Sequence, residues 1–342
     1  MTSDKKGIGI DLGTTTIVYE HGKSTGTIMN SQRKYGRDVI SRIGCSLKEQ
    51  GKKALMETVR KDLSDLLSDI PTDESIALAG NNVMICLLMG YDTEGFSHAP
   101  FHSGYEGSYK GQFMGHEAFF FPGIAPFVGG DITAGIYGLS IHEKEEMSLL
   151  IDLGTNGEMA LGNKDRIYVA SASAGPAFEG GRPGMYGSEV IDMICDLKES
   201  HVIDMYGTFT DDSYLENGYI YDKYTVLQDD IRDVQLAKGA VRAGVEVLMK
   251  EAGVDHEDIG TVYLSGNFGS NLLIEKAASI GLIPTELEKK TKMAGNTSLL
   301  GCSKLLAGGD PEEIKKIPGR ASHVELANHG DFNDLFVSHM NF

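Results

Sequence analysis

Apolar side chains recur at helical spacing in the segment 229–253. They form one stripe at steps of three or four residues, occupied by Ile231, Val234, Ala237, Val241, Val245 and Leu248. Such steps place the side chains on one face of an α-helix. Asp229 or Asp230 can cap the start of this helix and Gly253 can end it. The pattern predicts a long amphipathic helix over 229–253.

Two segments far apart in the chain have the pattern of a strand, a tight turn and a second strand. Residues 7–20 read GIGIDLGTTTIVYE and residues 148–161 read SLLIDLGTNGEMAL, so both contain the core I-D-L-G-T. One such hairpin is common, but two with the same core indicate an internal duplication. We therefore expect two similar halves that face each other across a cleft. The alternative is a pair of unrelated hairpins with ordinary turns.

The residue types of these turns suit a phosphate group and a metal ion. Glycine allows the backbone N–H groups of a turn to point outward and cradle phosphate oxygens, and threonine hydroxyls add donors. A carboxylate at the end of a strand does not itself bind phosphate, but it can hold Mg²⁺ through water. The repeat thus predicts a site for a metal–phosphate ligand, with Asp11 and Asp152 as the carboxylates linked to Mg²⁺.

A third segment, 262–271, reads VYLSGNFGSN and predicts a buried strand that runs into a Gly-rich turn before a helix over 271–279. Gly266 and Gly269 would let the backbone pass against a flat base or ribose. Alone, this is a common strand–turn–helix. Together with the two aspartate turns, it resembles the pattern shared by actin, the heat-shock chaperone ATPases and the sugar kinases.

This resemblance implies an α/β fold of two ribonuclease H-like lobes with a nucleotide cleft between them. Two helices would connect the lobes at the hinge, the first over 127–139 and the second over 229–253. Asp131 lies in the first of these helices, where related ATPases place an acidic residue near Mg²⁺ and the attacking water. The alternative for Asp131 is a simple N-cap of that helix. We expect a first lobe over 1–141 and a second over 142–342. Packing of the C-terminal segment against the first lobe is left open.

The negative charge of the chain excludes some classes of binding partner. Lysine and arginine number 31 and aspartate and glutamate 49, which gives a net charge of −18. A surface this negative repels phosphate backbones and anionic lipid head groups, so neither nucleic acid nor a membrane is expected as a partner. The longest apolar run, 83–89, is far shorter than the ~20 residues of a membrane span. The first residues, MTSDKK, show no secretory signal, so we expect a cytoplasmic protein.

The cysteines and the motif search exclude several kinds of site. No two of the four cysteines, Cys45, Cys86, Cys195 and Cys302, form a CxxC pair. The chain therefore encodes no local zinc or iron–sulfur site, and disulfides are not expected in a reducing compartment. The sequence also has no GxxxxGK[ST] loop, no GxGxxG fingerprint and no HExxH motif.

A more specific resemblance covers nearly the whole chain. Seven stretches occur in the order found in the nucleotide-binding domain of the reductive activators of corrinoid-dependent methyltransferases. These stretches are 30–43, 80–90, 122–135, 149–158, 171–181, 229–244 and SGNFG with the following 280–284. The resemblance implies an ATPase that binds an inactive Co(II) corrinoid protein and couples ATP hydrolysis to its reduction to Co(I).

The resemblance also implies the residues of the site, with ATP and Mg²⁺ as cofactors. The first phosphate loop would comprise Asp11, Gly13, Thr14 and Thr15, and the second would comprise Asp152, Gly154, Thr155 and Asn156. The adenosine loop would comprise Gly266, Asn267 and Gly269, and the cleft would be lined by Gly175 and Pro176. Asp131 would orient water or Mg²⁺. Asp11, Asp131 and Asp152 are thus the expected catalytic residues.

Two features depart from this family. Its members usually carry a fused iron–sulfur domain, whereas this chain has no cysteine cluster at either end. We therefore expect no cluster in this chain and a separate ferredoxin-like protein as the electron donor. The stretch after EGGRPGM (179–185) is also shorter than in relatives, so an intervening segment is expected to be missing, together with any partner contact that this segment makes.

Other functions of the same superfamily stay open. The chain can instead be a small-molecule kinase, which needs a substrate pocket with a general base beside the γ-phosphate. It can also be an interaction protein whose conformation is gated by nucleotide without a redox role. Five tyrosines among acidic residues in 206–224 predict a hairpin around Asn217 and Gly218, which is either a docking surface or an ordinary exposed hairpin. A homodimer is also left open.

Overall fold

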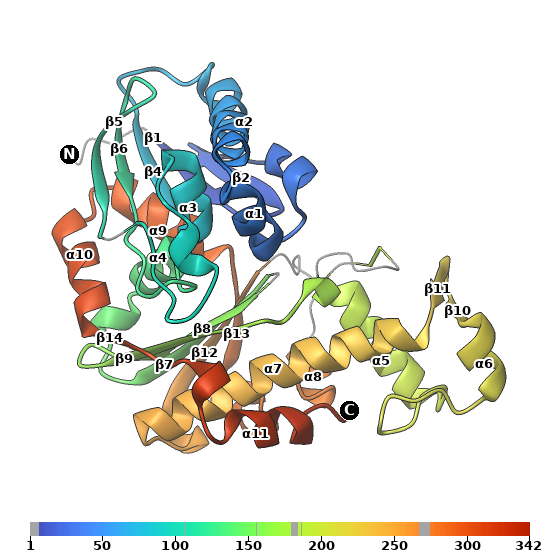
Figure 1. Ribbon diagram of the computed structural model, residues 1–342. Helices are drawn as coiled ribbons and strands as arrows, with labels where there is room; N and C mark the ends of the chain where they lie inside the picture. Colours follow the sequence, from blue (N-terminus) through green and yellow to red (C-terminus); the bar gives the residue numbers. More distant parts are fainter. Residues whose placement is uncertain (1–6, 106, 155, 179–183, 186, 267–273) are drawn as a thin grey trace. The chain divides into compact units, whose positions relative to one another are not determined.

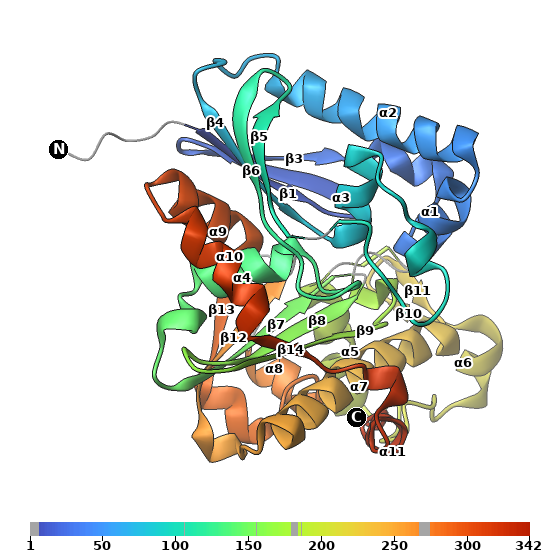
Figure 2. The ribbon, with the colours of Figure 1, turned by 60° about the vertical axis from the view of Figure 1, so that its left-hand side comes forward.

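The computed structural model describes residues 7–105, 107–154, 156–178, 184–185, 187–266 and 274–342 (Figures 1 and 2). The chain divides into two compact units. The first unit consists of Met1–His142 and Thr297–Ala321, and the second of Glu143–Asn296 and Ser322–Phe342. The chain therefore enters the second unit after His142, returns to the first at Thr297, and leaves it again after Ala321.

The first unit is built on a mixed six-stranded sheet. In sheet order its strands are β3 (Ser24–Met29), β2 (Thr16–His21), β1 (Gly7–Leu12), β4 (Ser75–Gly80), β6 (His116–Phe120) and β5 (Tyr109–Phe113). The first three form an antiparallel meander, β4 is parallel to β1, and β6 is parallel to β4. The helices of this unit are α1 (Val39–Ser46), α2 (Glu49–Leu67), α3 (Asn82–Met89), α4 (Gly130–Gly138), α9 (Thr297–Leu306) and α10 (Pro311–Arg320).

The alternation of residues in β1 decides which helices cover each face of this sheet. Ile8 and Ile10 are fully buried in the cluster formed with α1, α2 and α3. Gly9 between them faces α9, because a Cβ on Gly9 would lie 3.0 Å from the Cβ of Cys302. The absence of a side chain at Gly9 thus allows α9 to approach the strand closely. Asp11 continues this small-residue face of β1, since side chains alternate along a strand.

The second unit contains a six-stranded sheet of its own. In sheet order its strands are β13 (Thr291–Gly295), β12 (Ile259–Gly266), β7 (Met147–Leu153), β8 (Gly157–Gly162), β9 (Ile167–Ala172) and β14 (Ala321–His323), and β10 (Tyr219–Tyr221) pairs separately with β11 (Tyr224–Val226). Its helices are α5 (Ser188–Glu199), α6 (Asp212–Asn217), α7 (Gln228–Ala252), α8 (Ile274–Ser279) and α11 (Phe332–Ser338).

The two sheets share one topology. In the first unit the order β3-β2-β1-β4-β6 joins an antiparallel meander to two further parallel strands. In the second unit β9-β8-β7-β12-β13 repeats that order with the same strand directions. The hairpins with the I-D-L-G-T core occupy the same place in both sheets. The structure therefore confirms the duplicated α/β fold predicted from the repeat.

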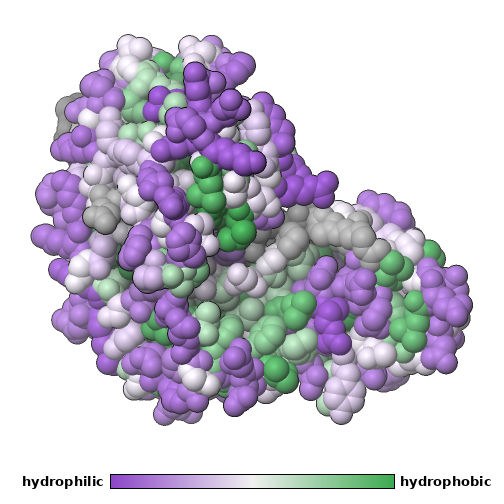
Figure 3. Space-filling model, viewed as in Figure 1, coloured by the Kyte–Doolittle hydropathy of each residue, from purple (hydrophilic) through white to green (hydrophobic). Residues whose placement is uncertain are grey.

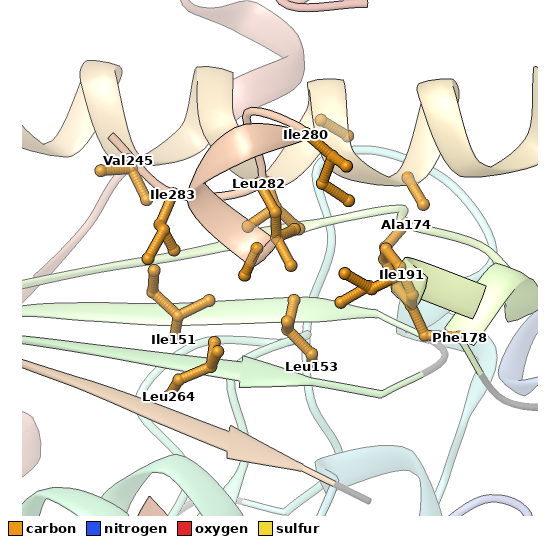
Figure 4. Packing of buried hydrophobic residues seen from close by; sticks show 14 of the residues in the cluster. Ile151, Leu153, Ala174, Phe178, Ile191, Val245, Leu264, Ile280, Leu282 and Ile283 are labelled. Carbon is orange, nitrogen blue, oxygen red and sulfur yellow. The ribbon is translucent and has the colours of Figure 1, made fainter. Parts of the chain in front are cut away.

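Helix α7 forms where the apolar stripe predicts it. The backbone N–H of Leu227, the N-cap residue, donates to the Asp230 carboxylate at 2.7 Å, and Gly253 ends the helix with a φ of +63°. The helix packs on β8, β9 and α11, all in the second unit. In Figure 4 the segment with Ile280, Leu282 and Ile283 lies between α7 and strand β7. The helix that leads from the second unit back into the first is α9.

The tyrosine-rich segment differs from its prediction. A hairpin is present, but its strands are Tyr219–Tyr221 and Tyr224–Val226, so the turn lies at Asp222 and Lys223. Asn217 instead ends the short helix α6, and Gly218 follows it with a φ of +77°. The prediction of a turn at Asn217 and Gly218 was wrong because an Asn-Gly pair also terminates helices.

Most of the surface in Figure 3 is polar, and hydrophobic residues appear among polar ones over the end that carries α6, β10 and β11. Leu215 and Ile220 are among the exposed apolar side chains of that segment. Among the helices that the structure describes, none is long and apolar enough to cross a membrane.

Candidate functional site

The first turn joins β1 to β2 and begins beside Asp11. Asp11 is half-buried in β1, paired in register with Val18 of β2 and Ala79 of β4. Gly13 starts the turn, and a Cβ there would lie 2.7 Å from the carbonyl oxygen of Thr16. Only glycine fits this close approach, because a side chain would push the two strands apart.

The carbonyl groups of this turn are held from one side. The Asn30 side-chain amide donates to the carbonyl oxygen of Gly13 at 2.9 Å, and its backbone N–H donates to that of Thr15 at 3.1 Å. The Arg42 guanidinium donates to the carbonyl oxygen of Thr14 at 2.6 Å. In a trans peptide the N–H points opposite to the C=O, so the amide groups that follow these carbonyls point away from Asn30 and Arg42. This is the orientation that an anion-binding turn requires.

The second turn joins β7 to β8 in the same way. Asp152 is half-buried at the end of β7 and pairs in register with Glu158 of β8. The backbone N–H of Gly154 donates to the carbonyl oxygen of Asn156 at 2.9 Å, which closes the turn. The Asn156 side chain reaches Glu158 at 3.5 Å. Thr155 lies outside the described residues.

Strand pairing brings two further predicted glycines, Gly266 and Gly175, to this edge of the second sheet. Strand β12 is parallel to β7, and Gly266 pairs with Leu153 directly after Asp152. Gly175, with a φ of +73°, stands just beyond β9, whose last residue pairs with the first residue of β8. The structure therefore gathers Asp152, Gly154, Asn156, Gly175 and Gly266 at one end of one sheet. Pro176 follows Gly175 as the first residue of a 3-10 turn, whereas Asn267 and Gly269 lie outside the described residues.

Asp131 lies at the corresponding edge of the first sheet. Gly80 ends β4 and pairs with Leu12 of β1, one residue after Asp11. A Cβ on Gly129 would lie 2.7 Å from the carbonyl oxygen of Gly80, so the start of α4 packs directly on the end of β4. Asp11, Gly13, Thr14, Thr15 and Asp131 therefore share one edge of the first unit.

Asp131 is half-buried, in surroundings that disfavour its charged form. The N-cap of α4 is Gly129, so the alternative in which Asp131 caps the helix was wrong. Asp131 lies in the first turn of the helix, and its carboxylate accepts the N–H of Ile132 at 2.9 Å. Burial raises the pKa of Asp131 to about 6, against the lowering effect of this hydrogen bond. A carboxyl with such a pKa can exchange a proton near neutral pH.

The structure reveals a second repeat that the sequence analysis missed. Residues 78–82 read LAGNN and residues 264–268 read LSGNF. Gly80 pairs with Leu12, and Gly266 pairs with Leu153, so the two segments end equivalent strands beside equivalent turns. In the first unit this segment begins helix α3, with the Asn81 side chain accepting the N–H of Val83 at 2.9 Å. A comparison of the chain with itself, with the two aspartate turns in register, would have found the pair.

Comparison with known proteins identifies the family of this chain. The family model described as the C-terminal domain of RACo, the ASKHA domain, matches residues 146–185 and 182–342. The model described as the RACo middle region matches residues 6–144. The chain belongs to the RACo family. The two matches to the ASKHA domain meet at 182–185, where the chain was expected to lack a segment.

Two curated relatives match almost the full length of this chain. The corrinoid activation enzyme RamQ of Eubacterium limosum is 27% identical over 419 residues, which cover 98% of this chain and 70% of RamQ. The Co(II) methylated amine-specific corrinoid protein reductase of Methanosarcina barkeri is 26% identical over 427 residues, with 98% and 77% covered. Both alignments are longer than the 342 residues of this chain, so each relative contains residues that the chain lacks.

A solved structure agrees with these relatives. The reductive activator for corrinoid, iron–sulfur protein matches 99% of this chain with a TM-score of 0.85 and 27% identity. The chain covers 66% of that protein, which is less than two thirds of its length. The family resemblance inferred from the sequence is therefore confirmed, and a substantial part of the solved relative has no counterpart here.

Proposed function

We propose that this protein is an ATP-dependent activator that drives the reduction of inactive Co(II) corrinoid proteins to the Co(I) state. One observation carries the proposal. The similarity to proteins named for corrinoid activation or reduction covers 98% of the chain and extends far beyond the phosphate turns. A protein that shared only the nucleotide-binding fold would be similar only around those turns.

We assign the binding of Mg–ATP to the two aspartate turns. The amide groups after Gly13, Thr14 and Thr15 point away from Asn30 and Arg42, which suits phosphate oxygens. Asp11 and Asp152 offer carboxylate oxygens, the donors that Mg²⁺ prefers, at the ends of equivalent strands. When bound, Mg²⁺ neutralises charge that develops on the phosphate oxygens. The residues present thus fit this cofactor in their chemistry.

The other predicted residues receive roles in the same proposal. Asp131, with its raised pKa, would orient the attacking water and accept its proton as the bond to the γ-phosphate breaks. Gly266, Asn267 and Gly269 would form the adenosine loop, and Gly175 and Pro176 would line the site. A substitution of Gly266 is not a clean test of adenosine contact. Its φ of +124° strains any other residue, with or without a nucleotide.

The electron is proposed to come from a separate ferredoxin-like protein. One electron passes from this donor to Co(II), which becomes Co(I), and the hydrolysis of ATP to ADP and phosphate supplies the free energy. The spacing of the cysteines supports this division, because Cys45, Cys86, Cys195 and Cys302 are far apart in the sequence and form no CxxC pair. A thiolate cluster in this chain would need cysteines close together.

Reconstitution tests the proposed function. The protein is mixed with ATP, Mg²⁺, a low-potential reductant and a Co(II) corrinoid protein, and the absorption of cobalt is followed together with phosphate release. We expect Co(I) to form only with ATP, and we expect the corrinoid protein to stimulate hydrolysis. A non-hydrolysable ATP analogue serves as the control and should give no Co(I).

The same assay separates the other functions of the superfamily. A kinase would release ADP together with a phosphorylated small molecule and without free phosphate. A nucleotide-gated interaction protein would bind ATP with negligible turnover. Formation of Co(I) at the same rate with and without ATP, over a panel of corrinoid proteins, would refute the proposal.

A further inference from the structure

A buried cation lies behind the first phosphate turn. Among the residues that the structure describes, Arg42 is the largest fully buried side chain, with 0% of its surface exposed. It belongs to α1 and to the stretch 30–43, one of those that resemble the family. Burial lowers the pKa of Arg42 to about 10, so the guanidinium is still charged at neutral pH.

The groups that contact Arg42 are uncharged, and one of them is a carbonyl group of the turn. Nε donates to the carbonyl oxygen of Gly36 at 3.0 Å, and Nη1 contacts the side-chain oxygen of Gln32 at 3.3 Å and the sulfur of Met84 at 3.1 Å. The shortest contact, at 2.6 Å, joins Nη2 to the carbonyl oxygen of Thr14. Within the described part of the chain, no carboxylate forms an ion pair with Arg42, and Asp38 acts on it only from farther away.

A buried charge without a counter-ion is costly, so the presence of Arg42 here calls for an explanation. Simple packing does not supply one, because a leucine or methionine would fill the same volume at lower cost. The explanation lies on the opposite side of the turn. Arg42 holds the Thr14 carbonyl, and the amide of Thr15 in the same peptide group points the other way. A positive charge behind that peptide strengthens its attraction for an anion in front.

Asn30 completes the support. Its side chain and its backbone hold the carbonyls of Gly13 and Thr15, on either side of the one held by Arg42. Asn30 is itself fixed, since its side-chain oxygen accepts the N–H of Gln32 at 3.0 Å. Gln32 is anchored in turn to the carbonyl oxygen of Leu55 in α2 at 2.9 Å. Three successive peptide groups of the turn are thus oriented from one buried polar cluster: Asn30, Gln32 and Arg42.

We infer that Arg42, assisted by Asn30, is the positioning residue of the first phosphate turn, fixing the direction of its amides and supplying positive charge behind them. Arg42 does not touch the nucleotide. It favours the phosphate chain and contributes nothing to the binding of the nucleoside. This inference rests on the proposed ATP site, and it adds a role that the predicted site residues do not include.

The experiment compares four variants with the wild type. Arg42→Met removes the charge at similar volume, Arg42→Lys keeps the charge but loses the fork of donors, and Asn30→Ala removes the neighbouring support. Arg60→Lys is the matched control. Arg60 lies in α2 of the same unit, and its guanidinium donates to the carbonyl oxygen of Leu88 in α3 at 2.9 Å. Circular dichroism and thermal unfolding identify variants that fail to fold.

Calorimetry with Mg–ATP, Mg–ADP and adenosine is the main measurement. We expect the Kd for Mg–ATP to rise about tenfold in Arg42→Lys and about a hundredfold in Arg42→Met, while the Kd for adenosine changes little. Arg60→Lys should match the wild type for all three ligands. A merely structural role of Arg42 would lower the unfolding temperature and weaken all three ligands equally. That result, or unchanged Mg–ATP affinity in folded Arg42 variants, would overturn the inference.

A second measurement separates this inference from the proposed function. Hydrogen exchange of the free protein over residues 12–18 reports the order of the turn without any nucleotide. Faster exchange in Arg42→Lys and Asn30→Ala, but not in Arg60→Lys, is expected if these side chains fix the turn. Unchanged exchange in the Arg42 and Asn30 variants would overturn the inference on its own. A wild-type protein that binds no ATP would refute the proposed function, whatever the exchange shows.

Discussion

Two ionisable side chains of the first unit, the fully buried Arg42 and the half-buried Asp131, lie where burial disfavours their charged forms. Burial lowers the pKa of Arg42 to about 10 and raises the pKa of Asp131 to about 6, and both shifts favour the neutral form of the side chain. Arg42 is still charged at neutral pH after this shift, whereas the pKa of Asp131 comes close to neutral pH. Spacing along the chain did not reveal either environment. Burial of a single residue depends on elements that pack against it, such as the start of α9, where the Ser298 hydroxyl reaches the Asp131 carbonyl.

The raised pKa of Asp131 predicts how stability depends on pH. A carboxyl that titrates near 6 when folded and near 3.9 when unfolded binds protons more tightly in the folded state. Its contribution is therefore favourable below about pH 4 and is lost as the pH rises through 6. Asp131→Asn keeps an oxygen for the N–H of Ile132 and carries no charge. We expect this variant to be more stable than the wild type at pH 8 by about 1–3 kcal/mol, and equally stable at pH 4.

Denaturant unfolding at several pH values checks this prediction. Asp73 is an exposed aspartate of the same unit, and Asp73→Asn serves as the control, with little effect at any pH. A difference between Asp131→Asn and the wild type that is the same at pH 4 and pH 8 would show that the carboxyl is not destabilised by burial.

At the scale of elements, the sequence predicted those whose pattern is set locally. Helix α7 and the two hairpins were predicted because their apolar periods and turn glycines suffice to define them. The pairing of α4 with α9 was not predicted, because it joins residues distant in the chain. Gly138 and Gly301 allow it: a Cβ on Gly301 would lie 2.2 Å from the carbonyl oxygen of Ala134. Such an approach has no local signal beyond a glycine in a helix.

The same substitution should therefore have opposite effects at two helical glycines of the first unit. Gly301→Ala forces α9 away from α4, and we expect a loss of about 2–3 kcal/mol in the free energy of unfolding. Gly44 in α1 has no atom within 4 Å of a Cβ, so Gly44→Ala should gain about 0.5–1 kcal/mol from helix propensity. Thermal and denaturant unfolding of the two variants measure both signs. Equal effects at the two positions would show that the close contact between α4 and α9 is absent in solution.

At the scale of the molecule, duplication explains why so much of the candidate site could be predicted. Asp11 and Asp152 are equivalent residues of one repeated topology, so a short shared motif marked both. The supporting cluster behind the first turn is not repeated in the motif and was missed as a result. Asn30 and Arg42 bind backbone carbonyl groups of the turn. Every residue has such a carbonyl, so the residue types in the turn do not predict these contacts.

The proposed function requires both turns to serve one nucleotide, and a double-mutant cycle tests this requirement. Asp11→Asn and Asp152→Asn each remove a carboxylate proposed to hold Mg²⁺ through water, and each should lower ATP turnover about 10- to 100-fold. Because groups that act as one unit lose their effect together, the double variant should be hardly worse than the more damaged single variant. Two independent sites would instead give an additive loss in free energy.

The control for the loss of a carboxylate as such is Asp65→Asn. Asp65 is exposed and paired with Lys61 in α2, so this variant should retain wild-type turnover. Full turnover in either single variant would remove that turn from the site, and strict additivity would contradict a shared nucleotide even if both turns bind phosphate.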